Sequence, residues 1–273
     1  MQWFGKGSNN VDDRRGGGLA IGGGLGVVII ILGLIFGQDF TSFLGDIPIQ
    51  NSTVQEPNNG TEDKDKQFVS GILESTEIVW SDLFASQGIT YQQPKLTLFT
   101  GQVQSACGGA SAAVGPFYCP ADYRIYIDLS FFEELSSRFG AQGDFAQAYV
   151  IAHEVGHHVQ NLLGTTDKIA QARSRLSEVD YNKHSVKLEL QADFFAGIWA
   201  HHVQKLKLFK LDPGDFEEAL NAANAIGDDK LQQNAGREVM PDNFTHGTSE
   251  QRMFWFKKGL ETGQLTEGNT FEN

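Results

Sequence analysis

The sequence predicts an α+β protein that is mostly helical, contains a small sheet and is preceded by one N-terminal transmembrane helix. Three observations predict this class: a long uncharged apolar run near the N-terminus, two short stretches with strand patterning, and helical periodicity over most of the remainder. The 273 residues, 40% of them hydrophobic and 20% charged, are enough for a packed core. This composition excludes a chain that is disordered throughout and a mini-protein held mainly by disulfides.

The apolar run predicts a membrane span. Residues 16–37 include no charged side chain, and Leu19–Gly37 as a helix would reach roughly 28 Å, close to the hydrocarbon thickness of a bilayer. A buried core helix rarely lacks every polar residue over this length. A cleaved secretory signal is the other alternative, but the run exceeds the usual apolar region of ~7–15 residues and no A-x-A site follows it. We therefore expect an uncleaved anchor in the lipid bilayer.

The charges on either side of this run predict its orientation. Residues 1–18 carry a net charge of +1, with Lys6, Arg14 and Arg15 against Asp12 and Asp13, so the total of −13 leaves −14 on the rest of the chain. By the positive-inside rule the segment 1–18 should be cytoplasmic and the remainder extracytoplasmic, either periplasmic or extracellular. The acidic surface argues against binding to nucleic acid. Nothing in the sequence indicates an oligomeric state.

The expected anchor is followed by a predicted flexible tether and then by one domain. Residues 38–66 are assigned to the tether because the stretch 47–66 is polar, contains Pro48 and Pro57 and lacks periodicity. The folded domain is expected at residues 67–273, with a first helix that runs from Gln67 toward Phe84. About 200 residues are typical of one domain.

Strands are predicted at Lys95–Phe99 (KLTLF) and Arg124–Asp128 (RIYID), and the two cysteines of the chain lie between them. A bridge between Cys107 and Cys119 would close a loop of about a dozen residues and stabilise the fold by roughly 3 kcal/mol. An extracytoplasmic domain is where such a bridge persists. The alternative is two buried free thiols. Zinc bound to these cysteines is disfavoured because no CxxC or cysteine–histidine spacing is present.

Helical patterns follow, and one of them carries a catalytic motif. A short helix is expected from Ser130 to Phe139, and a second from Asp144 to Leu163. The second contains His153-Glu154-Val155-Gly156-His157, an HExxH motif. Histidines at i and i+4 lie on one face of a helix and can bind one zinc ion, while the glutamate can reach a metal-bound water.

A catalytic zinc site needs a third protein ligand. The metzincin pattern fails, since Gln160 and Leu163 occupy its glycine and third-histidine positions. A later helix, 185–206, is otherwise apolar but places Glu189 and Asp193 on one face. We expect Glu189 to complete the site and Asp193 to accept a hydrogen bond from a liganding histidine. The alternative is a solvated acidic edge.

Together these stretches resemble a known family. AYVIAHEVGHHVQ and LELQADFFAGIWA, preceded by CGGA and GPFYCPADYRIYID and followed by THGTSEQR, are similar to the bacterial neutral zinc metallopeptidase family over Phe68 to about Gly263 and in the glycine-rich anchor. The resemblance implies a zincin-like metallopeptidase domain with a small sheet beside the active-site helix. It also implies a gluzincin-type site, in which His153, His157 and Glu189 bind one zinc ion per chain and Glu154 is the base. Cys107 and Cys119 match the paired cysteines of the family.

The predicted function is a membrane-anchored zinc peptidase that hydrolyses peptide or protein substrates, with Glu154 as the general base. Candidate stabilisers of the oxyanion are His246, which precedes a helix capped by Thr248, and Arg252; the alternative for both is a structural role. The stretch 115–119 (GPFYC) could border the substrate cleft. A different class stays open: a catalytically silent scaffold or assembly factor that keeps the zinc fold and binds a protein partner.

The remaining histidines receive structural interpretations. His158 points about 100° away from His157 on the helix. We expect surface or core roles for four histidines: His158, His184, His201 and His202.

Overall fold

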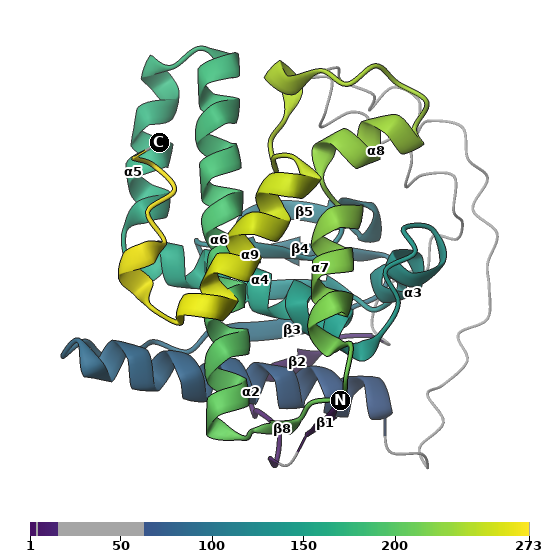
Figure 1. Ribbon diagram of the computed structural model, residues 1–273, viewed down its shortest axis with the longest axis vertical. Helices are drawn as coiled ribbons and strands as arrows, with labels where there is room; N and C mark the ends of the chain where they lie inside the picture. The colour runs from purple at the N-terminus through teal and green to yellow at the C-terminus, as the bar shows by residue number, and fades with distance from the viewer. Residues whose placement is uncertain (4, 16–62, 273) are drawn as a thin grey trace.

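The computed structural model describes residues 1–3, 5–15 and 63–272 (Figure 1). The expected transmembrane helix Leu19–Gly37 and most of the expected tether lie outside the described residues. Within them, no helix combines the length and the apolar character that a membrane crossing needs. The expected α+β class is confirmed, because helices dominate and the strands form only small sheets.

The first expected helix begins three residues earlier than Gln67, because Asp63 caps it through a hydrogen bond from the Lys66 amide. The helices are α2 (Lys64–Ser86), α3 (Ser130–Ser137), α4 (Asp144–Leu162), α5 (Thr165–Ala172), α6 (Glu178–Leu206), α7 (Asp215–Ala225), α8 (Asp228–Asn234) and α9 (Ser249–Thr262). The strands are β1 (Gln2–Trp3), β2 (Val11–Asp13), β3 (Lys95–Phe99), β4 (Gln102–Ser105), β5 (Gly108–Ser111), β6 (Phe117–Cys119), β7 (Arg124–Asp128) and β8 (Phe209–Lys210).

The main sheet has the strand order β2-β3-β7-β6. Strand β3 pairs in parallel with both β2 and β7, whereas β6 pairs antiparallel with β7 and forms one edge. Leu96 lies opposite Ile125 and Leu98 opposite Ile127, and these four side chains are fully buried. The two strands that the sequence predicted are therefore the centre of the sheet.

Helix α4 occupies the middle of the molecule (Figure 1). It contacts β6 and β7 on the sheet as well as α2, α6 and α7. Most of its side chains are buried, including Phe145, Ala148 and Ile151. A helix that is apolar on nearly every side is stable only inside a core. This surrounding packing fixes the position of the HExxH motif.

The disulfide predicted between Cys107 and Cys119 is present. It links the turn between β4 and β5 to the edge strand β6, so the hairpin β4–β5 is held against the sheet.

Residues 5–15 belong to the folded domain, which differs from the expected division into a separate segment 1–18 and a domain that starts at residue 67. Val11 to Asp13 pair with Leu96 to Leu98 as strand β2. The Gly7 amide donates to a Glu74 carboxylate oxygen at 2.7 Å. Asn10 donates from Nδ2 to Glu77 Oε1 at 2.7 Å. These contacts join distant parts of the chain, and no local periodicity in the sequence predicts them.

Candidate metal centre and active site

Helix α4 brings the two histidines of the motif together. The Nε2 atoms of His153 and His157 lie 3.2 Å apart, as the i and i+4 positions of a helix require. His153 is buried and His157 is partly exposed. Both rings therefore turn the same nitrogen toward one point at the surface of α4.

Helix α6 supplies the expected third group. Glu189 Oε2 lies 3.2 Å from His153 Nε2, and Glu189 Oε1 lies 3.5 Å from His157 Nε2. One ligand atom from each of the three residues lies within 4.8 Å of the other two. Two imidazoles and one carboxylate are a typical donor set for catalytic zinc. The residues present therefore fit a zinc ion.

The second nitrogen of each histidine is also engaged. His153 Nδ1 donates to Asp193 Oδ1 at 2.8 Å, and His157 Nδ1 donates to Gln160 Oε1 at 2.9 Å. A hydrogen bond donated from Nδ1 leaves Nε2 as the nitrogen that can bind a metal once the ring is neutral. The Gln160 side chain is itself fixed, because its Nε2 donates to the Leu188 carbonyl on α6 at 2.6 Å.

Asp193 is the centre of a buried network. Arg252 on α9 donates to both of its carboxylate oxygens, from Nε at 2.8 Å and from Nη2 at 3.0 Å. The Tyr149 hydroxyl donates to Oδ1 at 2.5 Å. The side chain of Arg252 is only 2% exposed. Two roles were expected for Arg252, in oxyanion stabilisation or in structure. This geometry supports the structural role, because Arg252 holds the Asp193 carboxylate in place.

The pKa values of these groups follow from burial and charge. Burial by itself would raise the pKa of Asp193, but Arg252 and His153 outweigh it and lower that pKa to about 2. Burial would lower the pKa of His153, but Asp193 and Glu189 raise it to about 10. For Glu154, burial dominates and raises the pKa above the ordinary value, although His157 and His153 act in the opposite direction. A raised pKa suits a group that must take up and release a proton.

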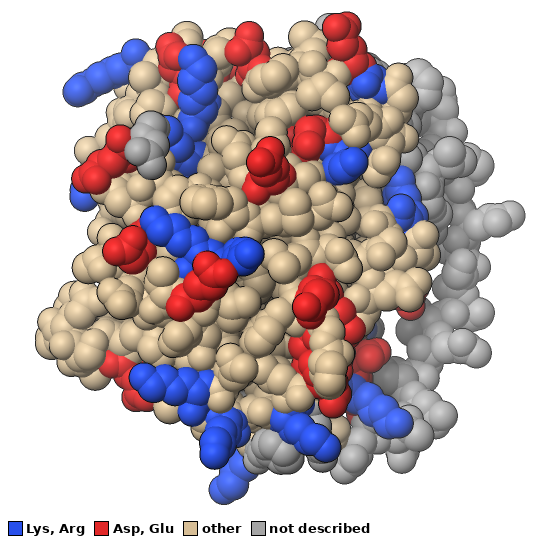
Figure 2. Space-filling model, in the orientation of Figure 1, with Lys and Arg blue, Asp and Glu red and all other residues tan. Residues whose placement is uncertain are grey.

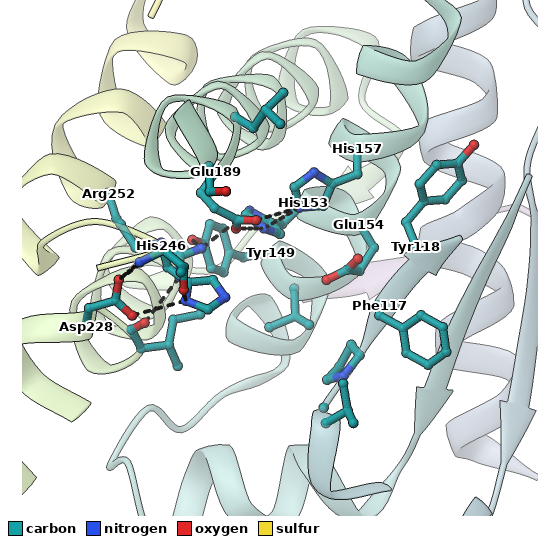
Figure 3. Close-up of a pocket in the computed structure, with 18 of the residues that line it drawn as sticks. Phe117, Tyr118, Tyr149, His153, Glu154, His157, Glu189, Asp228, His246 and Arg252 are labelled. Atoms are coloured by element: carbon teal, nitrogen blue, oxygen red, sulfur yellow. Dashed lines mark hydrogen bonds and ion pairs between the residues drawn. The ribbon is translucent and has the colours of Figure 1, made fainter. Parts of the chain in front are cut away.

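His246 and Asp228 form a second arrangement beside the histidines of α4 (Figure 3). Asp228 Oδ2 accepts the amide hydrogens of Thr245, His246 and Gly247, and Oδ1 lies 3.0 Å from His246 Nδ1. Partial burial lowers the pKa of His246, whose side chain is still 48% exposed, but Asp228 and Glu189 outweigh this and raise it above the ordinary value. The expected cap of α9 is present, since Thr248 and Gln251 form a capping box. The loop that carries His246 is thus fixed at both ends.

These groups surround a cavity of about 510 Å³. The three ligand candidates line it together with Glu154 and His246. Figure 3 shows the Glu154 carboxylate on the side that faces β6. Gly115, Pro116, Phe117 and Tyr118 also line the cavity, so the stretch expected to border the cleft does so.

Comparisons with known proteins identify the family. A family model described as "Putative neutral zinc metallopeptidase" matches residues 1–271. The chain belongs to this family. It is 46% identical over 285 residues to the uncharacterized protein YpfJ of Escherichia coli (strain K12), which covers 99% of each chain. It is 41% identical over 206 residues to the uncharacterized protein Rv2575 of Mycobacterium tuberculosis, which covers 72% of this chain and 67% of that protein. No solved structure matches the chain.

As a member of the neutral zinc metallopeptidase family, the chain is expected to use zinc in hydrolysis, and the structure assembles a site for that metal. The residues that the sequence singled out come from three helices and one loop, and all lie at this site: His153, Glu154, His157, Glu189, Asp193, His246 and Arg252. Their detailed roles, and a zincin-like fold, stay predictions.

Three residues of the metallopeptidase site were not predicted as participants: Tyr149, Gln160 and Asp228. Gln160 and Tyr149 lie on the motif helix, three and four residues from a histidine, so helical spacing could have suggested both. No such signal exists for Asp228, because its partner His246 is 18 residues away.

The other histidines have structural partners. His158 is fully buried and donates from Nε2 to the Gln92 carbonyl at 2.6 Å, while its Nδ1 accepts from the Tyr118 hydroxyl at 3.0 Å. His184, His201 and His202 each bond to a backbone carbonyl. Among the described residues, none of the four belongs to a group that could hold a metal ion.

Proposed function

We propose that the protein is a membrane-attached zinc peptidase in which Glu154 is the general base. The observation that carries this proposal is a buried glutamate with a raised pKa in the same cavity as three convergent metal ligands. A zinc ion held by His153, His157 and Glu189 would polarise the peptide carbonyl and lower the pKa of a bound water.

The side chains then divide the remaining work. Glu154 accepts a proton from the attacking water and delivers it to the nitrogen of the leaving amine. His246, held by Asp228 and carrying a raised pKa, donates a hydrogen bond to the carbonyl oxygen as negative charge develops there. Asp193 and Gln160 keep the two imidazoles oriented.

An extended substrate can reach this site along the sheet. Strand β6 is an edge strand, paired on one side with β7, and two of its residues line the cavity. An unpaired strand edge binds an extended peptide through main-chain hydrogen bonds. Substrate would therefore lie along β6 with its scissile bond beside Glu154.

Attachment to a lipid bilayer through Leu19–Gly37 is part of this proposal, and so is an extracytoplasmic location. The disulfide between Cys107 and Cys119 supports that location. The proposal places the N-terminal residues in the same compartment as the domain, in contrast to the cytoplasmic position expected for segment 1–18, and the pairing of β2 with β3 supports this.

The decisive experiment compares wild type with Glu154→Gln. Full-length protein is used, because residues 5–15 are part of the folded domain. The variant should keep its zinc, measured by elemental analysis, and should lose about 10²–10⁴-fold in the rate of peptide cleavage. Removal of zinc with a chelator should abolish wild-type cleavage, and added zinc should restore it.

The competing function is a zinc-binding scaffold that recognises a protein partner without cleaving it. An intact Glu154 disfavours it, because a binding module has no use for a general base. Wild type and Glu154→Gln that are equally inert toward a broad peptide library, with zinc bound to both, would establish the scaffold instead.

A further inference from the structure

The charged side chains that line the cavity already have partners or roles. Among the described residues, Arg252 is the one lysine or arginine in the lining, and both Asp193 oxygens bind it. Asp228 is used by three backbone amides and His246. Glu189 faces the two histidines. The remaining carboxylate in the lining is Glu154, the proposed base.

This arrangement bears on which end of a substrate could enter. An exopeptidase must bind the free amino or carboxylate group at the end of its substrate, and a dedicated opposite charge is the usual means. The described lining holds no uncommitted charge of either sign for that purpose. A chain terminus in the cavity would find no dedicated partner for its charge among these side chains.

One wall of the cavity is apolar. Phe131 on α3, Phe139 just beyond α3, and Val150 on α4 line it, and Val114 is a further member that is 39% exposed. A Cβ atom added at Gly115 would lie 3.5 Å from the ring of Phe131. The backbone just before β6 therefore lies against this wall. Val150 precedes Glu154 by one helical turn, which places this member of the apolar wall next to the base.

We propose that the protein is an endopeptidase that selects an apolar side chain beside the scissile bond, at a subsite formed by Val114, Phe131, Phe139 and Val150. This inference rests on the proposed peptidase function. The peptide runs along the edge strand and out of the cavity in both directions, and its two ends make no contact with the catalytic groups.

The test uses full-length, zinc-loaded enzyme and internally quenched peptides. Each peptide is made with free termini and with acetylated and amidated termini, and one position is varied among Phe, Leu, Lys and Asp. Blocking both termini should change kcat/KM by less than about threefold. Peptides with Phe or Leu at the selected position should be cleaved at least about tenfold faster than those with Lys or Asp, as an apolar pocket achieves.

Phe131→Ala should reduce this preference, whereas Phe254→Ala, at a side chain that is 58% exposed on α9, should leave it unchanged. Phe131→Asp should shift the preference toward Lys, a result that a general loss of structure does not produce. If Phe131 variants fail to fold, judged by zinc content and circular dichroism, Phe139→Ala tests the same wall.

The endopeptidase inference would be overturned if the enzyme removed single terminal residues and did so only from peptides with free termini. Equal cleavage of all four varied peptides, or an unchanged preference in folded Phe131→Ala, would overturn the apolar subsite. If the wild type cleaves no peptide and matches Glu154→Gln, the proposed function fails and this inference fails with it.

Discussion

Asp193 orients the candidate metal ligand His153 and neutralises the buried Arg252 at the same time. Its carboxylate is fully buried and receives hydrogen bonds from His153, Arg252 and Tyr149. A buried charge is tolerated when it is paired and fully hydrogen-bonded. Its pKa, lowered to about 2 by Arg252 and His153, keeps the carboxylate ionised at neutral pH.

Asp193→Asn keeps the shape of this side chain but removes its charge. We expect the affinity for zinc to fall about 10–100-fold, because the partner that orients His153 becomes weaker. The uncompensated Arg252 should also lower the free energy of unfolding by about 3–5 kcal/mol. Competition with a chromophoric chelator measures the first effect and urea denaturation of the metal-free protein measures the second. The control is Asp180→Asn, at a half-exposed position near the start of α6. If Asp193→Asn bound zinc as tightly as the wild type, the role assigned to Asp193 would be contradicted.

The crossing of α6 and α9 is the contact between elements on which this network depends. Gly197 on α6 faces Gly259 on α9, and an added Cβ at Gly197 would clash with the Phe256 carbonyl oxygen. A Cβ at Gly259 would clash with the Phe194 carbonyl oxygen. Two glycines therefore let the helices approach closely enough for Arg252 to reach Asp193.

Gly197→Ala should destabilise the protein. In an open helix this change would be favourable by about 1 kcal/mol, but the clash with a backbone atom cannot be relieved by a side-chain rotation and should cost more. We expect a net loss of at least about 2 kcal/mol in the free energy of unfolding, measured by urea denaturation. Lys257→Ala, 62% exposed on α9, should stay within about 0.5 kcal/mol of wild type. A stabilised Gly197→Ala would show that the helices are farther apart.

At the scale of the whole molecule, the N-terminal residues constrain membrane topology. Arg15 forms an ion pair with Asp63, and Lys66 lies 3.5 Å from Asp13. The two segments that flank residues 16–62 therefore lie next to each other on the domain. A single bilayer crossing between residues 15 and 63 would put these partners on opposite faces. The expected orientation and the pairing of β2 with β3 therefore exclude each other in one molecule.

Cysteine labelling in intact cells tests this point. The two native cysteines are joined in a disulfide and should not react. Lys6→Cys and Ser86→Cys both place a thiol at an exposed position, one in the N-terminal segment and one in the domain. Because the two positions share one compartment, a membrane-impermeant maleimide should modify both variants under the same condition, either before or only after permeabilisation. Modification of one before and the other only after would refute the docking of residues 5–15.

The predicted elements are those whose signals are local. The strands Lys95–Phe99 and Arg124–Asp128 have the bounds that the sequence predicted, because each is a short run of strand-forming residues, nearly all of them buried in the centre of the sheet. Strand β2 was not predicted, because two of its three residues are aspartates, which are uncommon in strands. Its stability comes from pairing with β3 and from nearby arginines, such as Arg124, which donates to Asp12 at 3.0 Å.

The sequence by itself marked the candidate metal ligands on α4, because the spacing of His153 and His157 sets their positions once a helix forms. It also marked Glu189 and Asp193, since acids on an apolar helix need buried partners. Only the tertiary structure decided that Arg252 holds Asp193, that Asp228 holds His246, and that the N-terminal strand completes the sheet. The physical reason is that each of these contacts joins segments far apart in the chain, whose meeting depends on the packing of the whole core and on no local period.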